Sequence, residues 1–316
     1  MTNVMQMSEE LQKGVSVVIP VYNSAQIMPH LLDRLHTVLD ALGQPFEVIL
    51  VDDGSRDESW AVIRKFAEIH PWVRGITLRR NFGQHNALLA GIRHVRMSIC
   101  ITMDDDLQNP PEEIPALLAR HADGYDVVYG KPVEEQHGIL RNIASKLTKR
   151  ALQDFMGVEN AGHVSAFRVF STSIRTAFAD FRGPFVALDV LLTWGACKYG
   201  HVVVSHDQRY MGESQYSLKK LTTLALNLMT GFSVWPLQIA SLLGLSLTVF
   251  GMIVLVYVFG RLLIEGSSVA GFPFLASIIA VFSGAQLFTL GIMGEYLSRV
   301  HFRILGMPTY VISSTT

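Results

Sequence analysis

The chain has 316 residues, of which 49% are hydrophobic, and a formal net charge of −1 at pH 7. This near-neutral balance gives no sign of a nucleic-acid-binding surface, and the mean hydropathy of +0.30 is that of a globular domain averaged with membrane helices. The sequence contains no internal repeat and no low-complexity tract.

The first residues and the cysteines both indicate a cytosolic domain. Residues 1–14 are polar and lack the apolar core of a signal peptide, so we expect the N-terminus to stay in the cytosol. Cys100 and Cys197 lie in apolar contexts, which indicates packing residues in a reducing compartment rather than a disulfide framework.

Strands and helices alternate over the N-terminal half. Apolar, β-branched runs predict strands at 14–21, 46–51, 73–78, 98–103 and 126–129, and amphipathic patterns predict helices at 27–42, 58–70, 86–95 and 112–122. Continuous apolar strands separated by helices predict an α/β fold with a mainly parallel, Rossmann-like sheet covered on both faces. In such sheets, ligands bind beyond the carboxyl ends of the strands.

Polar residues follow the predicted strands where each strand ends. They are Tyr22-Asn23, Asp52-Asp53-Gly54-Ser55, Arg79-Arg80-Asn81 and Asp104-Asp105-Asp106. Because the carboxyl ends of parallel strands meet at the same edge of a sheet, we expect these groups to converge on one site.

The acidic cluster at 104–106 predicts a metal site. Asp104 and Asp106 have D-x-D spacing and directly follow a strand, so both carboxylates can project toward one site. Hard oxygen ligands suit Mg²⁺ or Mn²⁺, which would bridge to the diphosphate of a nucleotide sugar and neutralise the leaving group. An isolated triple aspartate is more often a solvated turn or a helix cap, but the strand context and the second cluster at Asp52 favour the metal site.

Two further strand ends allow alternative interpretations. Asp52 can belong to a capped turn, or it can accept a hydrogen bond from the N3 proton of uracil. Arg79 and Arg80 are either surface charges or contacts to phosphate and base.

Two segments between the predicted domain and the C-terminus are candidates for membrane contact. Residues 138–155 interleave basic and apolar side chains, which fits either a helix lying on anionic lipid or a solvated helix face. Residues 218–235 form a second candidate, ending in an aromatic anchor at Trp235.

Two long stretches without Asp, Glu, Lys or Arg follow, at 221–260 and 266–294. At ~1.5 Å per residue, the second reaches roughly 43 Å as a helix, which exceeds the hydrocarbon thickness of about 30 Å. We therefore predict antiparallel transmembrane helices at 236–264 and 267–294. The alternative, a pair of buried core helices, is disfavoured because charge-free runs of this length are rare in soluble folds.

Flanking charge sets the predicted orientation. Lys219 and Lys220 precede the first span and Arg299 and Arg303 follow the second, so both ends should face the cytoplasm. The predicted layout is a catalytic domain at 1–215, an interfacial helix at 216–235, the spans and a cytoplasmic tail at 295–316. The small residues Gly244, Gly251 and Gly260 permit close helix packing, which favours a homo-oligomer.

Several motifs together resemble a known family. In chain order they are VVIPVYNSA, VDDGSRDES, LRRNFGQHNALLAGI, TMDDDLQNPPEEIP, GYDVVYG and GESQYSLKKL, followed by the predicted spans. This set resembles family 2 glycosyltransferases of the polyprenyl-phosphate type, which include dolichol-phosphate mannose synthases, bactoprenol glucosyl transferases and undecaprenyl-phosphate formamido-arabinose transferases. The match covers nearly the whole chain, and the segments NFGQH and DLQNPPEEIP look closest to the formamido-arabinose branch.

The resemblance implies a GT-A fold, a nucleotide-sugar donor, a divalent metal and an inverting transfer to a lipid phosphate. Carried over by matching positions, the nucleotide-binding residues are Pro20, Tyr22, Asp52, Arg80, Asp104 and Asp105, the metal ligands are Asp104 and Asp106, and the acceptor and diphosphate residues are Arg209, Ser214, Tyr216 and Ser217. Asp106 and Arg209 would be catalytic.

One departure from the family pattern concerns the base. Members usually carry an acidic residue shortly before the Phe-Arg pair that is Phe167-Arg168 here, and this chain has none there. His163 is the only nearby side chain with a suitable pKa, either as a base or as an ordinary loop histidine. A phosphate monoester is already mostly dianionic at pH 7, with a second pKa of about 6, so the nucleophile needs positioning more than deprotonation.

These observations predict an enzyme of the bacterial inner membrane that moves a sugar from a UDP-sugar to undecaprenyl phosphate at the cytoplasmic face. A processive polysaccharide synthase is disfavoured, because the chain has no Gln-x-x-Arg-Trp segment and too few predicted spans for a channel. The alternative from another class is a catalytically silent, membrane-anchored nucleotide-sugar binder or assembly protein, which the missing carboxylate favours.

Overall fold

The computed structural model describes residues 11–132, 164–183, 186–205, 207, 235–265 and 272–316. These residues belong to two compact units. The first unit contains the chain up to Tyr216 together with Gly306–Thr316, and the second contains Ser217–Leu305.

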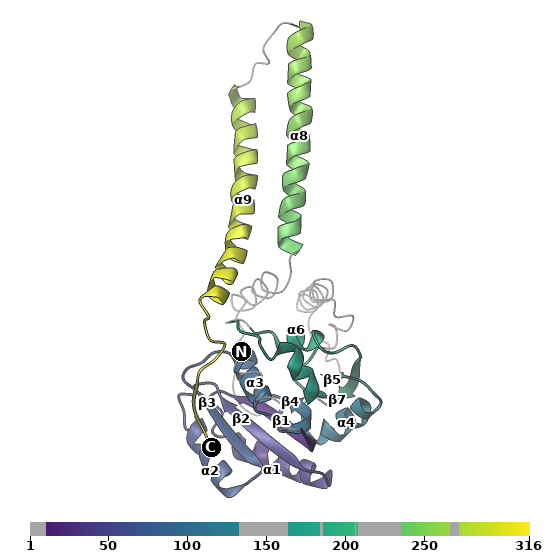
Figure 1. The fold of residues 1–316 in the computed structure, drawn as a ribbon, viewed down its shortest axis with the longest axis vertical. Coiled ribbons are helices and arrows are strands. Elements are labelled where there is room, and N and C mark those ends of the chain that lie inside the picture. Colours follow the sequence, from purple (N-terminus) through teal and green to yellow (C-terminus); the bar gives the residue numbers. More distant parts are fainter. Residues whose placement is uncertain (1–10, 133–163, 184–185, 206, 208–234, 266–271) are drawn as a thin grey trace. The chain divides into compact units, whose positions relative to one another are not determined.

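A mixed, mostly parallel sheet forms the centre of the first unit (Figure 1). Among the described residues its strands run in the order β7-β5-β6-β4-β1-β2-β3-β8. Their bounds are Gln12–Val21 for β1, Phe46–Asp52 for β2, Val73–Leu78 for β3, Met97–Thr102 for β4, Val127–Pro132 for β5, Arg168–Ser171 for β6, Tyr199–Val204 for β7 and Ile312–Thr315 for β8. Strands β4, β1, β2 and β3 are parallel neighbours. Strand β6 pairs antiparallel with β4 and β5, and β8 pairs antiparallel with β3.

Helices cover both faces of this sheet. Their bounds are Met28–Ala41 for α1, Ser59–Ile69 for α2, Gln84–Arg93 for α3, Ile114–Ala122 for α4 and Leu188–Thr193 for α6, with 3-10 turns η1 at Pro111–Glu113 and η3 at Thr172–Phe178. The amphipathic pattern explains the packing of α1, in which Met28 and four leucines recur every three or four residues and are buried.

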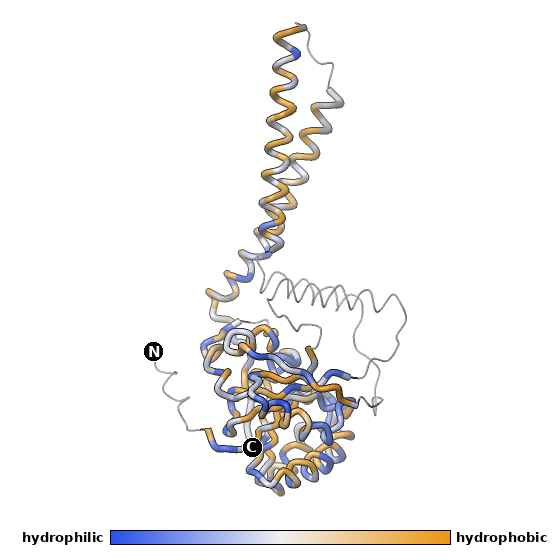
Figure 2. Tube along the Cα trace, turned by 90° about the vertical axis from the view of Figure 1, so that its right-hand side faces the viewer, coloured by the Kyte–Doolittle hydropathy of each residue, from blue (hydrophilic) through white to orange (hydrophobic). Residues whose placement is uncertain are grey.

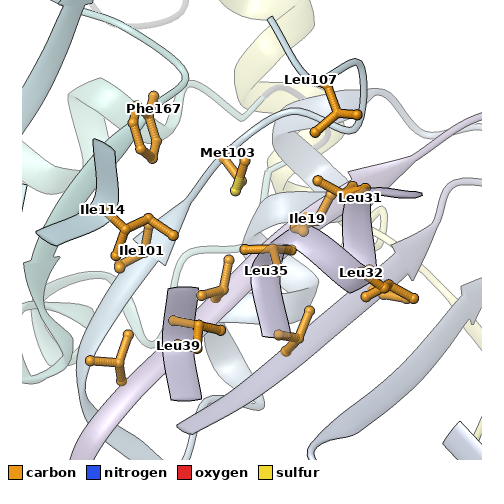
Figure 3. Close-up of a cluster of buried hydrophobic side chains, with 14 of the residues drawn as sticks. Ile19, Leu31, Leu32, Leu35, Leu39, Ile101, Met103, Leu107, Ile114 and Phe167 are labelled. Atoms are coloured by element: carbon orange, nitrogen blue, oxygen red, sulfur yellow. The ribbon is translucent and has the colours of Figure 1, made fainter. Parts of the chain in front are cut away.

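Side chains of β1 alternate between the two faces, as the strand period of two requires. Val15, Val17 and Ile19 join a core that also takes in buried residues of α1 and α4 (Figure 3). Val18 points to the opposite face, where Gly91 of α3 lies so close that an added Cβ would be 2.4 Å from the Val18 side chain. The mostly parallel sheet with both faces covered confirms the α/β prediction.

The structure adds elements that the sequence does not predict. Strands β6 and β7, the short helix α6 and the turn η3 lie after the last predicted strand. Strand β8 comes from the predicted tail and pairs antiparallel with β3. Cys100 is buried, as expected of a packing residue, whereas Cys197 is exposed, so its apolar sequence context was misleading.

The second unit contains helices α8, Trp235–Glu265, and α9, Phe272–Ile304. Among the described residues, one segment is long and apolar enough to cross a membrane, Pro236–Arg261 in α8, with a mean hydropathy of 2.5. Many large apolar side chains of α8 are exposed, among them Leu255 and Val256 at 66% each, and Figure 2 shows apolar residues along most of the helix. Contact of such an apolar surface with water is unfavourable, so the surface of α8 fits a lipid environment.

Helix α9 overlaps the second predicted span, which remains a prediction. The helix continues past residue 294 to Ile304 and includes charged side chains in its last turns. Gly251 of α8 lies against Phe282 of α9, where an added Cβ would be 2.9 Å from the ring. Gly251 therefore allows close helix packing, as the small-residue pattern predicts.

Candidate active site

The polar strand ends converge at the carboxyl edge of the four parallel strands β4, β1, β2 and β3. After β1, the Tyr22 backbone N–H donates to Asp105 Oδ2 at 3.3 Å. The Gln84 side-chain amide, at the start of α3, donates to Asp104 Oδ1. The backbone N–H of Asn23 donates to Ser55 Oγ at 3.0 Å. These contacts confirm the prediction that residues from separate strand ends meet on one edge.

Asp52 ends β2 as a buried carboxylate with both oxygens engaged. Oδ2 accepts a hydrogen bond from the Thr77 hydroxyl at 2.7 Å, and Oδ1 accepts one from the Ser55 backbone N–H at 3.0 Å. Because each carboxylate oxygen has two lone pairs, Asp52 can still accept from a ligand donor. Its side chain is thus held in one orientation at the strand end.

Asp53 organises the loop after β3. Its two oxygens accept hydrogen bonds from the backbone N–H groups of Phe82 at 2.7 Å and Gly83 at 2.8 Å. Gly54, with φ of +68°, brings its backbone against Arg80, where a Cβ would lie 2.5 Å from the Arg80 carbonyl carbon. A side chain at position 54 would therefore push the loop out of place.

The burial of Asp53 predicts a specific pH dependence of stability. Burial raises the pKa of Asp53 to about 6, although the two backbone N–H bonds lower it. Its folded-state pKa exceeds the unfolded value of about 3.9, so the folded protein binds more protons between them. We therefore expect the free energy of unfolding to fall by on the order of 2 kcal/mol as pH rises from about 4 to about 6, then to level off.

Asp53→Asn tests this expectation. The variant should lose this part of the pH dependence, while its overall stability drops because asparagine offers one oxygen to two N–H donors. Unfolding of both proteins in detergent, followed by tryptophan fluorescence across this pH range, measures the difference. Equal slopes for the two proteins would contradict the prediction.

The residues of the acidic cluster fit a divalent cation. Asp104, Asp105 and Asp106 are half-buried, and Asp106 Oδ1 accepts from the Gln108 backbone N–H at 3.1 Å. Among the described residues, no group of three or more His, Cys, Asp or Glu side chains could enclose a metal. Mg²⁺ is commonly bound by one or two carboxylates together with substrate phosphates, so Asp104 and Asp106 suit an ion that arrives with a diphosphate.

The other predicted nucleotide-binding residues lie around the same edge. Pro20 is buried in β1 opposite Val51, and Tyr22 is half-buried directly after the strand. Arg80 is exposed, with its guanidinium 4.8 Å from the centre of the Phe82 ring. The predicted residues His163, Arg209, Ser214, Tyr216 and Ser217 lie outside the described part of the chain.

A buried ion pair borders this edge, and the sequence did not reveal it. Arg168, paired with Thr102 at the end of β4, forms a salt bridge with Asp189 of α6. The Tyr129 hydroxyl donates to Asp189 Oδ1 at 3.1 Å. The Phe-Arg motif marked one partner, but Asp189 lies 21 residues later on a helix too short to show a periodic pattern.

His85 connects α3 to α6 beside this ion pair. Its Nδ1 accepts from the Leu188 backbone N–H at 3.4 Å, which places the proton of the neutral ring on Nε2. Burial lowers the pKa of His85, and the Arg168 charge acts in the same direction, while Asp189 opposes them. The ring therefore remains neutral near pH 7.

Solved structures identify the fold. Glucosyl-3-phosphoglycerate synthase from Mycobacterium tuberculosis, solved with Mn²⁺, UDP and glucosyl-3-phosphoglycerate, aligns with a TM-score of 0.53 over 69% of this chain and 78% of that one, at 16% identity. Another structure of this synthase gives a TM-score of 0.52 with the same coverage, at 17% identity. At such low identity the likeness concerns the fold, which is that of GT-A glycosyltransferases.

Sequence comparisons identify the family. The sequence model named Glycosyl transferase family 2 matches residues 16–180. Curated relatives named undecaprenyl-phosphate 4-deoxy-4-formamido-L-arabinose transferase are 37% identical in Shewanella sediminis, over 94% of this chain and 91% of the relative, and 34% identical in Klebsiella pneumoniae, over 95% and 93%. The relative from Pseudomonas aeruginosa strain LESB58 is 38% identical over 94% and 89%. The chain belongs to glycosyl transferase family 2 and is a glycosyltransferase, which confirms the resemblance.

Proposed function

We propose that this chain transfers a sugar from a UDP-sugar to undecaprenyl phosphate at the cytoplasmic face of the bacterial inner membrane. The observation that carries the proposal is the convergence of Asp52 and the 104–106 cluster at one sheet edge, in a chain that spans at least 89% of its undecaprenyl-phosphate transferase relatives. The transfer inverts the configuration at the anomeric carbon of the sugar, because the lipid phosphate displaces the nucleoside diphosphate directly.

In this proposal the donor base lies against the ends of β1 and β2. Asp52 accepts the N3 proton of uracil, with its orientation set by Thr77 and Ser55, and Pro20 and Tyr22 line the base. Arg80 and Asp105 contact the rest of the nucleotide. The UDP held by the synthase of similar fold supports a uridine donor.

Asp104 and Asp106 would hold Mg²⁺ or Mn²⁺ against the diphosphate. Such an ion neutralises the charge that develops on the leaving UDP. Gln84 and the Gln108 backbone N–H orient the two carboxylates. The Mn²⁺ that accompanies UDP in the synthase of similar fold supports this assignment.

The acceptor is the phosphate of the lipid. One of its oxygens attacks the anomeric carbon, the bond from that carbon to the diphosphate breaks, and UDP leaves with the electron pair. Arg209, with Ser214, Tyr216 and Ser217, would hold this phosphate, since a guanidinium engages phosphate oxygens in a fork. His163 is the candidate base, in a reaction where the dianionic nucleophile has little need of one.

The course of the chain supports two membrane crossings. Residues 11–207 and strand β8 belong to one folded unit, yet the apolar helix α8 lies between them in the sequence. A chain that leaves this unit into the bilayer must return to the same side to form β8. We therefore propose that α8 and α9 form a hairpin with both termini in the cytoplasm, consistent with the flanking lysines and arginines.

Reporter fusions test this topology. An alkaline phosphatase inserted at Gly266 should be active, because the hairpin tip would lie in the periplasm, and one fused after Thr316 should be inactive. A fluorescent protein that folds only in the cytosol should give the opposite pattern. Periplasmic activity of the fusion after Thr316 would refute the hairpin.

Close packing between copies is part of the proposal. Gly251 packs against Phe282 of α9 in the same chain, whereas Gly244 and Gly260 of α8 have no described atom within 4 Å of an added Cβ. These glycines would let a second copy approach α8, giving a homo-oligomer.

A donor panel tests the assignment of the nucleotide. Several UDP-sugars and one GDP-sugar are each incubated with the detergent-solubilised protein and undecaprenyl phosphate, and the release of free nucleoside diphosphate is measured. We expect a UDP-sugar to be used and the GDP-sugar to be rejected, because guanine has a different donor pattern opposite Asp52. Use of the GDP-sugar alone would overturn the uridine assignment.

A further inference from the structure

The last residues of the chain lie against the elements that carry the proposed donor site. We define the C-terminal segment as residues 306–316, which run from the end of α9 to Thr316. Its strand β8 pairs with β3 through Ile76 opposite Thr315 and Thr77 opposite Ser314. The Thr316 backbone N–H donates to the Gly75 carbonyl at 3.0 Å, and Thr316 Oγ1 accepts from the Gly75 N–H at 2.8 Å.

The paired strand β3 supports Asp52 directly. Thr77, which pairs with Ser314, donates its hydroxyl hydrogen to Asp52 Oδ2 at 2.7 Å. Without β8, β3 would form the edge of the sheet among the described strands. An unpaired edge strand frays more easily, so the orientation of Thr77 depends on β8.

The segment also holds the loop at 79–83 and the first turn of α3. The Arg79 backbone N–H donates to the Val311 carbonyl at 2.9 Å. The Asn86 side-chain amide donates to the Thr309 carbonyl at 2.6 Å, and both residues are 5% exposed. Hydrogen bonds between buried groups are costly to lose, because the remaining partner has no water to replace the contact.

The loop is thus fixed from two sides. Asp53 binds the N–H groups of Phe82 and Gly83 near its end, and the C-terminal segment binds Arg79 at its start. Between these points lies Arg80, and immediately after them lies Gln84, which orients Asp104. Neither anchor alone constrains both ends of the loop.

We propose that the C-terminal segment is a positioning element of the donor site, with Asn86 as its main side-chain contact. This inference rests on the proposed function, because the proposed function assigns UDP to the sheet edge that the segment supports. The C-terminal segment would then contribute to catalysis by positioning the donor site. The inference also means that the donor site is completed only when residues 306–316 have been synthesised.

Separate measurements for donor and acceptor test the proposal. UDP affinity is measured by calorimetry, and KM by turnover with varied UDP-sugar or varied undecaprenyl phosphate. Asn86→Ala should weaken UDP binding by about threefold to tenfold, the equivalent of one buried hydrogen bond, and deletion of residues 309–316 by at least about tenfold. KM for the lipid phosphate should stay within about twofold of wild type in both variants.

Two controls separate positioning from general damage. Ser314→Ala alters an exposed side chain on the same strand, and three residues inserted after Gly306 lengthen the connection to α9 without removing a contact described above. Both should bind UDP like the wild type. If the deletion variant does not fold, Asn86→Ala decides the matter.

The outcomes distinguish this inference from the proposed function. If the wild type binds UDP, and Asn86→Ala and the folded deletion variant bind it with the same affinity, the positioning role alone is overturned. A parallel rise in KM for donor and acceptor would also overturn it, since it would indicate a structural loss. A wild-type protein that binds no UDP would overturn the proposed function, and the inference with it.

Discussion

Asp106→Asn is expected to lower the rate of sugar transfer by at least about hundredfold while the domain stays folded. Asparagine keeps an oxygen that can accept from the Gln108 N–H, so the turn after β4 should persist. It removes the negative charge that a divalent ion requires, and metal stabilisation of a leaving diphosphate amounts to several kcal/mol, with about 1.4 kcal/mol for each factor of ten.

Initial rates and thermal unfolding measure the two parts of this prediction. Asp123→Asn serves as the matched control, because Asp123 is an exposed carboxylate that pairs with Arg120 at 3.0 Å on α4. It should leave the rate unchanged. Chelation by EDTA should reproduce the loss, and added Mg²⁺ or Mn²⁺ should reverse it. Full activity in EDTA would rule out the metal role of Asp104 and Asp106.

Asp189→Ala is expected to have the largest effect on stability. It removes the partner of Arg168, whose side chain is 2% exposed, and leaves a buried charge uncompensated. Breaking such a pair costs about 3 to 5 kcal/mol. For a domain of this size, that corresponds to a fall in Tm of about 10 °C.

The control is again Asp123, the residue directly after α4. Asp123→Ala breaks an ion pair whose side chains are 41% and 57% exposed, and it should cost less than about 1 kcal/mol. The double variant Arg168→Met with Asp189→Leu should recover much of the lost stability, because it removes the uncompensated charge as well. Equal losses for Asp189→Ala and Asp123→Ala would show that burial does not govern the strength of these pairs.

The sequence predicts well the part of the fold in which patterns are local. Strand β3 has the predicted bounds, and β1, β2 and β4 differ by one or two residues at their ends. The polar groups after these strands could be assigned to one edge because parallel strands share a direction. Asp52 and the 104–106 cluster were found on that basis, although only the structure identifies Asp53 as the anchor of the loop.

The remaining elements have no such local signal. Strand β8 consists of the residues Ile-Ser-Ser-Thr, mostly exposed, and it is held by backbone hydrogen bonds to a strand more than 200 residues earlier. Helix α6 has six residues, fewer than two turns, so its apolar residues are too few to show a helical periodicity in the sequence. The contact of Arg168 with Asp189 depends on α6, and that of Asn86 with Thr309 depends on the C-terminal segment that contains β8.

Transfer of a radiolabelled sugar to lipid tests the central claim most directly. The purified protein in detergent is given a labelled UDP-sugar, undecaprenyl phosphate and Mg²⁺ or Mn²⁺, and the chloroform-soluble label is counted and resolved by chromatography. We predict a labelled polyprenyl-phosphate sugar that forms only when lipid phosphate is present and disappears with Asp106→Asn. A protein that binds UDP but transfers no label to lipid from any UDP-sugar would contradict the account, and would favour a silent nucleotide-sugar-binding protein.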